Sequence, residues 1–241
     1  MTTALIIGAT GGIGSAITAD LASHGWQLHV AARDEGRLQP LVEQGMTAHC
    51  LNAQDRAALD VAVKAAQQEA GDEPLAMVMA VGSIVLKPAH RTDHDLFMET
   101  LQQNLVTAFN LVAAAGAHCR KGGSVLLFSS AAARMGLMNH EAIAAAKAGV
   151  EGLVRAAAAT YAGRGLRVNA LAPGLVDTPL AGHLTGSPAA LEASQKLHPL
   201  GRIGQPEDLV AAARWLLDPA STWVTGQVIG IDGGLSVCRA G

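Results

Sequence analysis

"ALIIGATGGIG", residues 4–14, is an apolar run that ends in a cluster of glycines, and the helical stretch "SAITADLASHG" follows it at residues 15–25. The apolar run predicts a buried strand. Glycines at 8, 12 and 14 permit a tight turn, a close backbone approach and contact between helix and sheet. A helix that begins directly after such a turn points its backbone N–H groups at any anion held there. A plain strand-to-helix connection has the same pattern, so this stretch alone leaves two interpretations.

The rest of the chain favours the first interpretation, because short apolar runs alternate with helical patterns throughout. The predicted strands cover residues 4–9, 27–33, 47–52, 75–81, 123–130, 166–173 and 227–234. The predicted helices lie near residues 13–24, 34–44, 54–70, 93–120, 140–163 and 206–217. Strands joined by helical crossovers predict one doubly wound α/β domain over residues 1–241, of the Rossmann type, with a seven-stranded parallel sheet and helices on both faces. At the first strand–helix junction of such a chain, the turn predicts a dinucleotide site made by Gly8, Thr10, Gly11, Gly12, Ile13 and Gly14.

Residues 178–205 are the one long irregular insertion in this pattern. In a compact domain such a segment is usually functional or mobile, and we interpret it as a lid over the substrate. Its apolar side chains indicate an apolar or modest-sized ligand; they are Leu180, Leu184, Leu191 and Leu197.

Composition excludes several classes of protein. The 241 residues carry a formal net charge of −3, with lysines and arginines scattered, which is not the footprint of a protein that binds nucleic acid or an anionic membrane. No apolar run is long enough to span a bilayer, and the amino terminus lacks the basic flank of a signal peptide. Cys50, Cys119 and Cys238 are widely spaced and have no metal-ligating neighbours, so we expect reduced thiols, no metal site and a cytoplasmic location.

The end of the second predicted strand bears on the choice of dinucleotide. A carboxylate there would bind the adenosine ribose of NAD, but the position holds Ala32, and the cation Arg33 follows. A guanidinium suits a 2′-phosphate, so NADP is favoured over NAD. Asp34 is the competing ribose ligand if the strand runs further; we interpret it as the N-cap of the next helix.

Motifs spread over the whole chain match one family. They are "GATGGIG" (8–14), "NAQD" (52–55), "AVG" (80–82), "QQNLVTAFNL" (102–111), "FSSAAA" (128–133), "RVNALAPGLVDTPL" (167–180), "GRIGQPEDLVAAARWLL" (201–217) and "TGQVIGIDGG" (225–234). In this set the chain resembles the short-chain dehydrogenase/reductases over essentially its full length. The resemblance implies an NAD(P)-dependent oxidoreductase acting on CH–OH or C=O groups, assembled as a homo-oligomer, either a tetramer or a dimer.

Some departures from the family pattern are mild. Asn52 stands where an aspartate usually meets the adenine amino group, and its side-chain oxygen can accept the same bond. Met79 and Ala80 replace the two asparagines of the usual N-N-A-G. The resemblance implies cofactor contacts from Asn52, Ala53, Val81 and Gly82.

One departure is large. The family carries Tyr-x-x-x-Lys on its catalytic helix, with a serine thirteen residues before the tyrosine. In "NHEAIAAAKAG" (139–149), Lys147 stands at the lysine position and Ser130 at the serine position, but the tyrosine position is Ile143. A phenol near an ammonium can protonate an alkoxide near neutral pH, whereas isoleucine has no proton to give. Lys147 retains its implied bond to the nicotinamide ribose, and Ser130 its bond to a carbonyl oxygen.

His140 is the nearest candidate for a substitute acid. It lies one helical turn before position 143, and imidazole titrates near neutral pH. It is seven residues from Lys147, about 10 Å along a helix. The alternative is a first-turn surface residue, in a helix that Asn139 caps and whose positive end Glu141 favours.

The resemblance implies further contacts. Asn104 would bind the backbone of the catalytic helix and hold a water, or, as a plain helix-interior asparagine, bond locally. Pro173, Gly174, Val176 and Thr178 match the loop on the nicotinamide side of the cofactor.

Three functions therefore stay open. The first is an NADP-dependent oxidoreductase whose proton comes from water, His140 or the substrate. The second is a cofactor-binding protein without redox turnover, such as a sensor or an inactive partner subunit. The third is non-redox chemistry at Ser130. Fold similarity does not choose among them.

Overall fold

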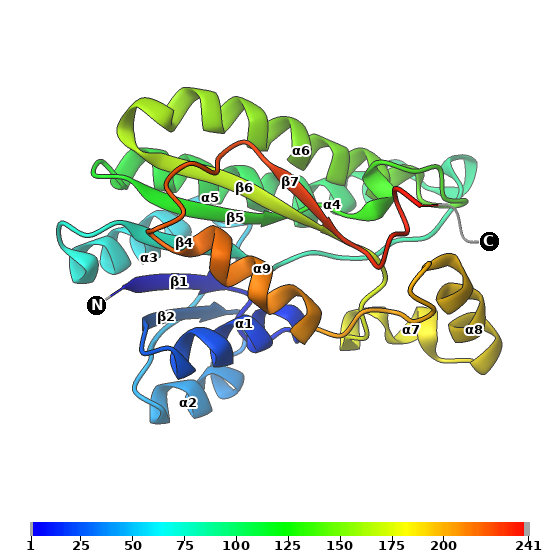
Figure 1. Cartoon of the computed structure of the whole chain (residues 1–241), viewed down its shortest axis with the longest axis horizontal. Coiled ribbons are helices and arrows are strands. Elements are labelled where there is room, and N and C mark those ends of the chain that lie inside the picture. The colour runs from blue at the N-terminus through cyan, green and yellow to red at the C-terminus, as the bar shows by residue number, and fades with distance from the viewer. Residues whose placement is uncertain (1, 239–241) are drawn as a thin grey trace.

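Seven parallel strands form one sheet in the computed structural model, which describes residues 2–238 (Figure 1). The strands are β1 (Thr3–Ile7), β2 (Gln27–Ala32), β3 (Thr47–Cys50), β4 (Leu75–Met79), β5 (Gly123–Phe128), β6 (Leu166–Pro173) and β7 (Val228–Ile231). The five residues of β1, the first five of β5 and all eight of β6 are buried, as expected for strands covered on both faces. The predicted fold class and all seven predicted strands are confirmed.

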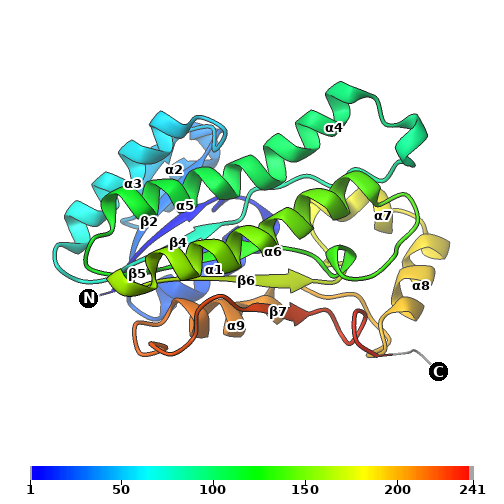
Figure 2. The same cartoon turned by 90° about the horizontal axis from the view of Figure 1, so that it is seen from above.

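Helices cover both faces of this sheet (Figures 1 and 2). One face packs against α3 (Arg56–Ala70), α5 (Thr107–His118) and α6 (Glu141–Tyr161). The other packs against α1 (Gly12–Ser23), α2 (Glu35–Glu43) and α9 (Glu207–Leu217). None of the helices within residues 2–238 combines the length and apolarity needed to cross a membrane.

The order of the strands locates a crevice. Across the sheet they run β3-β2-β1-β4-β5-β6-β7, so the chain winds outward from β1 to β3 and then crosses back to β4. In open parallel sheets, ligands bind at the carboxyl ends of the two strands where the winding reverses. Here those strands are β1 and β4, and the glycine-rich turn follows β1.

The segment 178–205 is not irregular, contrary to the prediction. It contains α7 (Gly182–Thr185) and α8 (Pro188–Leu197), which lie beyond the carboxyl ends of the strands (Figures 1 and 2). The Ser187 side chain accepts a hydrogen bond from the Ala190 N–H, and Pro188 occupies the first turn of α8. These are standard helix-start signals that the sequence analysis passed over.

The predicted helix 93–120 is interrupted. It consists of α4 (His94–Leu101), a π-helical segment Gln102–Val106 and α5. Such π-segments are rare and occur frequently at functional sites. Asn104 lies in this one, and its side chain is buried.

A hydrogen-bonded chain of three side chains links β2, β3 and α3, away from the crevice. His29, only 2% exposed, has its Nε2 2.7 Å from Glu69 Oε2 and its Nδ1 2.9 Å from His49 Nε2. The two imidazole rings are nearly parallel, at 15°. A bond between two ring nitrogens needs one donor and one acceptor, so the pair cannot be doubly protonated and keep it.

We expect these hydrogen bonds among Glu69, His29 and His49 to make the free energy of unfolding depend on pH. Burial, and secondarily the charge of His29, lower the pKa of His49 below its usual value. The pKa of His49 is lower in the folded protein than in the unfolded chain, so the unfolded chain binds a proton more readily. The stability present above about pH 6.5 is therefore lost as the pH falls toward the lowered pKa. His49→Gln removes the titration. Thermal unfolding from pH 7.5 to 5 should therefore show a steeper fall in Tm for the wild type than for this variant. Parallel curves would contradict the prediction.

Candidate active site

The glycine-rich turn fits closely against its neighbours and has no room for side chains. Gly8 has a φ of +88°, and a Cβ at Gly14 would lie 2.1 Å from the Gly8 carbonyl oxygen. A Cβ at Gly8 would lie 2.8 Å from the Ala80 carbonyl, just after β4. The backbone of the turn therefore lies in direct contact with the residue that follows β4, the close approach that a dinucleotide site requires.

The start of α1 leaves backbone donors free for a ligand. Gly11 precedes the helix and has no side chain to cap it. A Cβ at Gly12 would lie 2.6 Å from Thr178 Cγ2, so the loop after β6 reaches the turn although it is 166 residues away in the sequence. Uncapped N–H groups facing an open, backbone-lined turn fit a pyrophosphate. The residues present thus suit the phosphate part of a dinucleotide.

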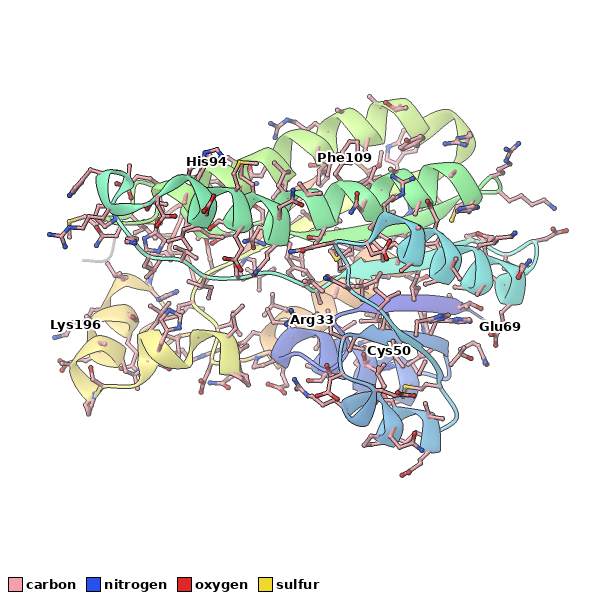
Figure 3. All side chains as sticks on the ribbon, turned by 180° about the vertical axis from the view of Figure 1, so that it is seen from behind. Arg33, Cys50, Glu69, His94, Phe109 and Lys196 are labelled. Carbon is pink, nitrogen blue, oxygen red and sulfur yellow. The ribbon has the colours of Figure 1, made fainter. Side chains whose placement is uncertain are left out.

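Two arginines lie beside this turn on the β2 side. Arg33 directly follows β2 and is exposed; its carbonyl oxygen is 3.5 Å from the Cys50 Sγ (Figure 3). Arg37, on α2, donates from Nη2 to the Thr10 carbonyl oxygen within the glycine-rich turn. The Asp34 carboxylate accepts from the Arg37 N–H, which confirms it as the N-cap of α2.

Asn52 and Ala53 follow β3. The Asn52 side-chain oxygen accepts from the Gln54 N–H at 3.1 Å, so one of its two lone pairs serves a local turn and one stays available. Ala53 is buried, next to apolar core residues.

Asn104 is bound differently from the prediction. Its Oδ1 accepts from the Ser83 N–H at 3.1 Å, and its Nδ2 donates to Ser83 Oγ at 2.9 Å and to the Thr100 carbonyl at 3.0 Å. These bonds use both amide hydrogens, and the side chain makes none to α6 within the described residues. The expected bond to the backbone of the catalytic helix is therefore wrong, and the alternative, a local bond within the asparagine's own helix, is confirmed by the bond to Thr100. Asn104 instead holds Ser83, which follows Val81 and Gly82 after β4.

Lys147 extends from α6 toward Gly82, in the segment that follows β4. Its Nζ donates to the Phe128 carbonyl oxygen at 3.0 Å and would lie 3.5 Å from a Cβ at Gly82. None of the ion pairs among residues 2–238 includes it. Burial without a counter-charge lowers the pKa of Lys147 to about 8.

Ser130 follows β5 and begins a single 3-10 turn, Ala131–Ala133. Its Oγ accepts from the Ala132 N–H at 3.2 Å, which leaves its hydroxyl hydrogen free to donate. Its neighbour Ser129 ties this turn to α6, because Ser129 Oγ lies 3.2 Å from the Lys147 carbonyl and 3.0 Å from Glu151 Oε1. Ser130 and Lys147 are thus anchored to the same segment.

Ile143 and His140 occupy the start of α6. Ile143 is only 4% exposed and packs inward, one turn before Lys147. His140, not Asn139, is the N-cap residue, and no side chain caps the helix, so the predicted Asn139 cap is wrong. Asn139 has a φ of +63°, a conformation that asparagine tolerates better than most residues. His140 Nδ1 is 2.7 Å from the Met138 carbonyl.

The loop after β6 connects the crevice to residues 178–205, which contain α7 and α8. Pro173 ends β6, Val176 pairs with Gly204, and Thr178 Oγ1 accepts from the Ala181 N–H. His198, at the end of α8, accepts from the Leu175 N–H at Nε2. A Cβ at Gly174 would lie 2.5 Å from that nitrogen.

Comparisons with known proteins agree with this architecture. A family model described as enoyl-(acyl carrier protein) reductase matches residues 8–236. The chain belongs to the short-chain dehydrogenase/reductase family. A 3-oxoacyl-(acyl-carrier-protein) reductase of Thermotoga maritima is 32% identical over 97% of both chains, and a D-threitol dehydrogenase of Mycolicibacterium smegmatis is 32% identical over 97% of this chain and 92% of that one. A crystal structure of a putative gluconate dehydrogenase from Agrobacterium tumefaciens has a TM-score of 0.91 at 26% identity, covering 99% of this chain and 97% of that chain.

Within this dehydrogenase/reductase fold, three residues near the crevice were missed by the sequence analysis. Ser83, Arg37 and His198 each make their key bond to a residue more than twenty positions away. The only signal that the sequence offered was the position of Ser83, a polar residue four positions past the end of β4.

Proposed function

We propose that the protein is an NADP(H)-dependent oxidoreductase that interconverts a carbonyl compound and an alcohol without the usual catalytic tyrosine. The observation that carries this is the meeting of the glycine-rich turn, Gly82 and the Lys147 ammonium at the carboxyl ends of β1 and β4. The family uses NAD(P), and the curated relatives act on CH–OH or C=O groups. The exposed Arg33 supports NADP over NAD.

The residues divide the work as follows. Gly8, Gly12 and Gly14 admit the pyrophosphate, Arg33 meets the 2′-phosphate, and Asn52 and Ala53 border the adenine. The bound cofactor supplies or accepts a hydride. Lys147 bonds the nicotinamide ribose, Ser130 donates to the carbonyl oxygen and holds it in place, and the loop from Pro173 to Thr178 borders the nicotinamide. Residues 178–205 form the lid over an apolar or modest-sized carbonyl substrate.

The experiment has two readouts. Tryptophan or nicotinamide fluorescence should show saturable NADPH binding, and absorbance at 340 nm should show slow NADPH oxidation with members of a ketone and diketone panel. Absence of both would overturn the proposal.

A second candidate function is favoured by Ile143. A phenol is missing from the position one turn before Lys147, so the protein could bind NADP(H) as a sensor or as an inactive partner of an active relative. Tight NADPH binding without oxidation by any of the panel would establish this alternative instead.

We also propose a homo-oligomer. The strand β7 is an edge of the sheet, and edges are prone to pair with another chain. Phe109 on α5 and Trp215 on α9 are 55% and 48% exposed (Figure 3 labels Phe109). We expect sedimentation at micromolar concentration to give a dimer or tetramer, and Phe109→Glu to weaken it. A stable wild-type monomer would contradict this prediction.

A further inference from the structure

The residues at the start of α6 offer no evident proton donor for the site. Ile143 is buried and has no ionisable hydrogen. The Glu141 carboxylate accepts from the Ala89 N–H at 3.4 Å, at the outer end of α6. His140 is the helix N-cap, bonded at Nδ1 to Met138, and lies seven residues before Lys147.

The hydroxyl groups nearby can pass or share a proton but cannot supply one alone. Ser130 Oγ and Ser83 Oγ each accept one bond, from the Ala132 N–H and from Asn104 Nδ2. Neither has a histidine or carboxylate among its partners in the described structure. An aliphatic hydroxyl without such a partner is far too weak an acid to protonate an alkoxide near neutral pH.

Lys147 differs from these hydroxyl groups in its charge, its hydrogen-bond partners and its surroundings. It carries an ionisable proton and has one bonded partner, the neutral Phe128 carbonyl. Its ammonium therefore has two further N–H bonds to direct elsewhere. A Cβ at Gly82 would lie 3.5 Å from Nζ and 2.8 Å from the Asn104 Oδ1, which already accepts from the Ser83 N–H, so the absence of a side chain at Gly82 leaves space beside the ammonium. Nothing in the described structure neutralises the ammonium by an ion pair.

We propose that the Lys147 ammonium itself supplies the proton in carbonyl reduction, in the place of the missing phenol. The role rests on the proposed oxidoreductase function. As the carbonyl carbon gains a hydride from NADPH, which is thereby oxidised to NADP⁺, the C=O π bond breaks and the oxygen takes H⁺ from Nζ, directly or through one water or Ser130. The ammonium becomes a neutral amine, the substrate becomes an alcohol, and the amine regains H⁺ from solvent. In the oxidation direction the neutral amine takes the alcohol proton.

Burial makes this chemistry accessible. An ordinary lysine, with a pKa near 10.4, is a poor acid at neutral pH, whereas a pKa of about 8 gives a stronger acid that remains mostly protonated at pH 7. Because the protonated form is needed for reduction, kcat/KM should be flat below about pH 8 and fall about tenfold per pH unit above it.

The first test does not depend on turnover. Limited acetylation with acetic anhydride at a series of pH values, followed by peptide mass spectrometry, reports the ionisation of Lys147 in the folded protein, with the exposed Lys64 as a reference. We expect a midpoint near pH 8 for Lys147. A midpoint close to 10.4 would overturn the proposal.

The second test separates proton donation from cofactor binding. Lys147→Arg keeps a positive charge that does not titrate, and Lys147→Met removes it; both are measured at saturating NADPH, with Lys64→Arg as the control for surface charge. We expect reduction to fall at least about a hundredfold in both variants, with NADPH still bound. A wild-type profile without a break near pH 8, or a saturated Lys147→Met that reduces at the wild-type rate, would overturn the role of Lys147. Failure to bind NADPH, or NADPH binding without reduction of any panel member, would overturn the proposed oxidoreductase function itself, whereas the two outcomes above require an enzyme that turns over and count against Lys147 alone.

Discussion

Ile143→Tyr is expected to raise the rate of carbonyl reduction by up to about a hundredfold above that of the wild type. This is the lower end of the range that a placed general acid contributes, because Lys147 already supplies the proton in the wild type. The new phenol would stand one helical turn before Lys147, near enough for the ammonium to lower its pKa. Lys147 is already bonded to Phe128 and Ser129, the two residues before Ser130. The substitution would therefore add the missing tyrosine to a serine and a lysine that are already in place. The measurement is kcat/KM for NADPH-dependent ketone reduction.

Ile143→Phe is the matched control, because it adds the ring without the hydroxyl. Ile143 is buried, so either ring will overpack the site at a cost of about 1–3 kcal/mol, visible as a lower Tm in both variants. We expect the phenylalanine variant to stay as slow as the wild type. If the folded, cofactor-bound tyrosine variant is no faster than a wild type that already reduces ketones at ordinary rates, Ile143 does not limit the chemistry.

The variant His140→Ala tests whether this histidine donates the proton in carbonyl reduction by the wild type. Because His140 is the N-cap residue and is bonded at Nδ1 to Met138, we expect unchanged reduction and unchanged NADPH affinity. Loss of activity with cofactor affinity intact would instead identify His140 as the donor and count against Lys147.

The fold could be predicted because the signals were local and repeated. Each buried strand is a short apolar run, and the glycines at 8, 12 and 14 are needed for contacts whose distances leave no room for a Cβ. The errors also have local causes. The helix α8 starts at Ser187 and Pro188, a clear signal that was outweighed by the glycines and prolines around it. The π-segment at Asn104 could not be read from periodicity, because the apolar pattern continues through it.

The candidate site was predictable only where a residue follows a strand in sequence or matches a family motif. Ser130 and Gly82 follow β5 and β4, whereas Lys147 lies inside α6, and all three were found by their match to the family motifs. The pairing of Ser83 with Asn104 joins residues 21 positions apart, and that of Arg37 with Thr10 joins residues 27 apart. Such contacts arise from the order of strands β2, β1, β4 and β5 in the sheet, which no single segment of the sequence encodes.

Arg33→Ala is expected to reduce the affinity for NADPH about tenfold to a hundredfold and to leave the affinity for NADH nearly unchanged. A charge-assisted bond from a guanidinium to a 2′-phosphate contributes about 1.5–3 kcal/mol, which corresponds to that range. Ala32 offers no carboxylate to bind the ribose of NADH, so the variant should lose selectivity without gaining NADH affinity. Calorimetric titration of both cofactors into wild type and variant measures this.

Two matched variants decide which cation is responsible. Arg120→Ala removes an exposed arginine between α5 and β5, at the opposite end of the strands, and should change neither affinity. Arg37→Ala removes a guanidinium that already donates to the Thr10 carbonyl, so it should loosen the glycine-rich turn and weaken both cofactors to a similar degree. A selective loss of NADPH in Arg37→Ala, with Arg33→Ala unchanged, would move the 2′-phosphate contact to Arg37. Equal wild-type affinities for NADPH and NADH would rule out either arginine as a selective contact, because a bound 2′-phosphate must favour the cofactor that carries it.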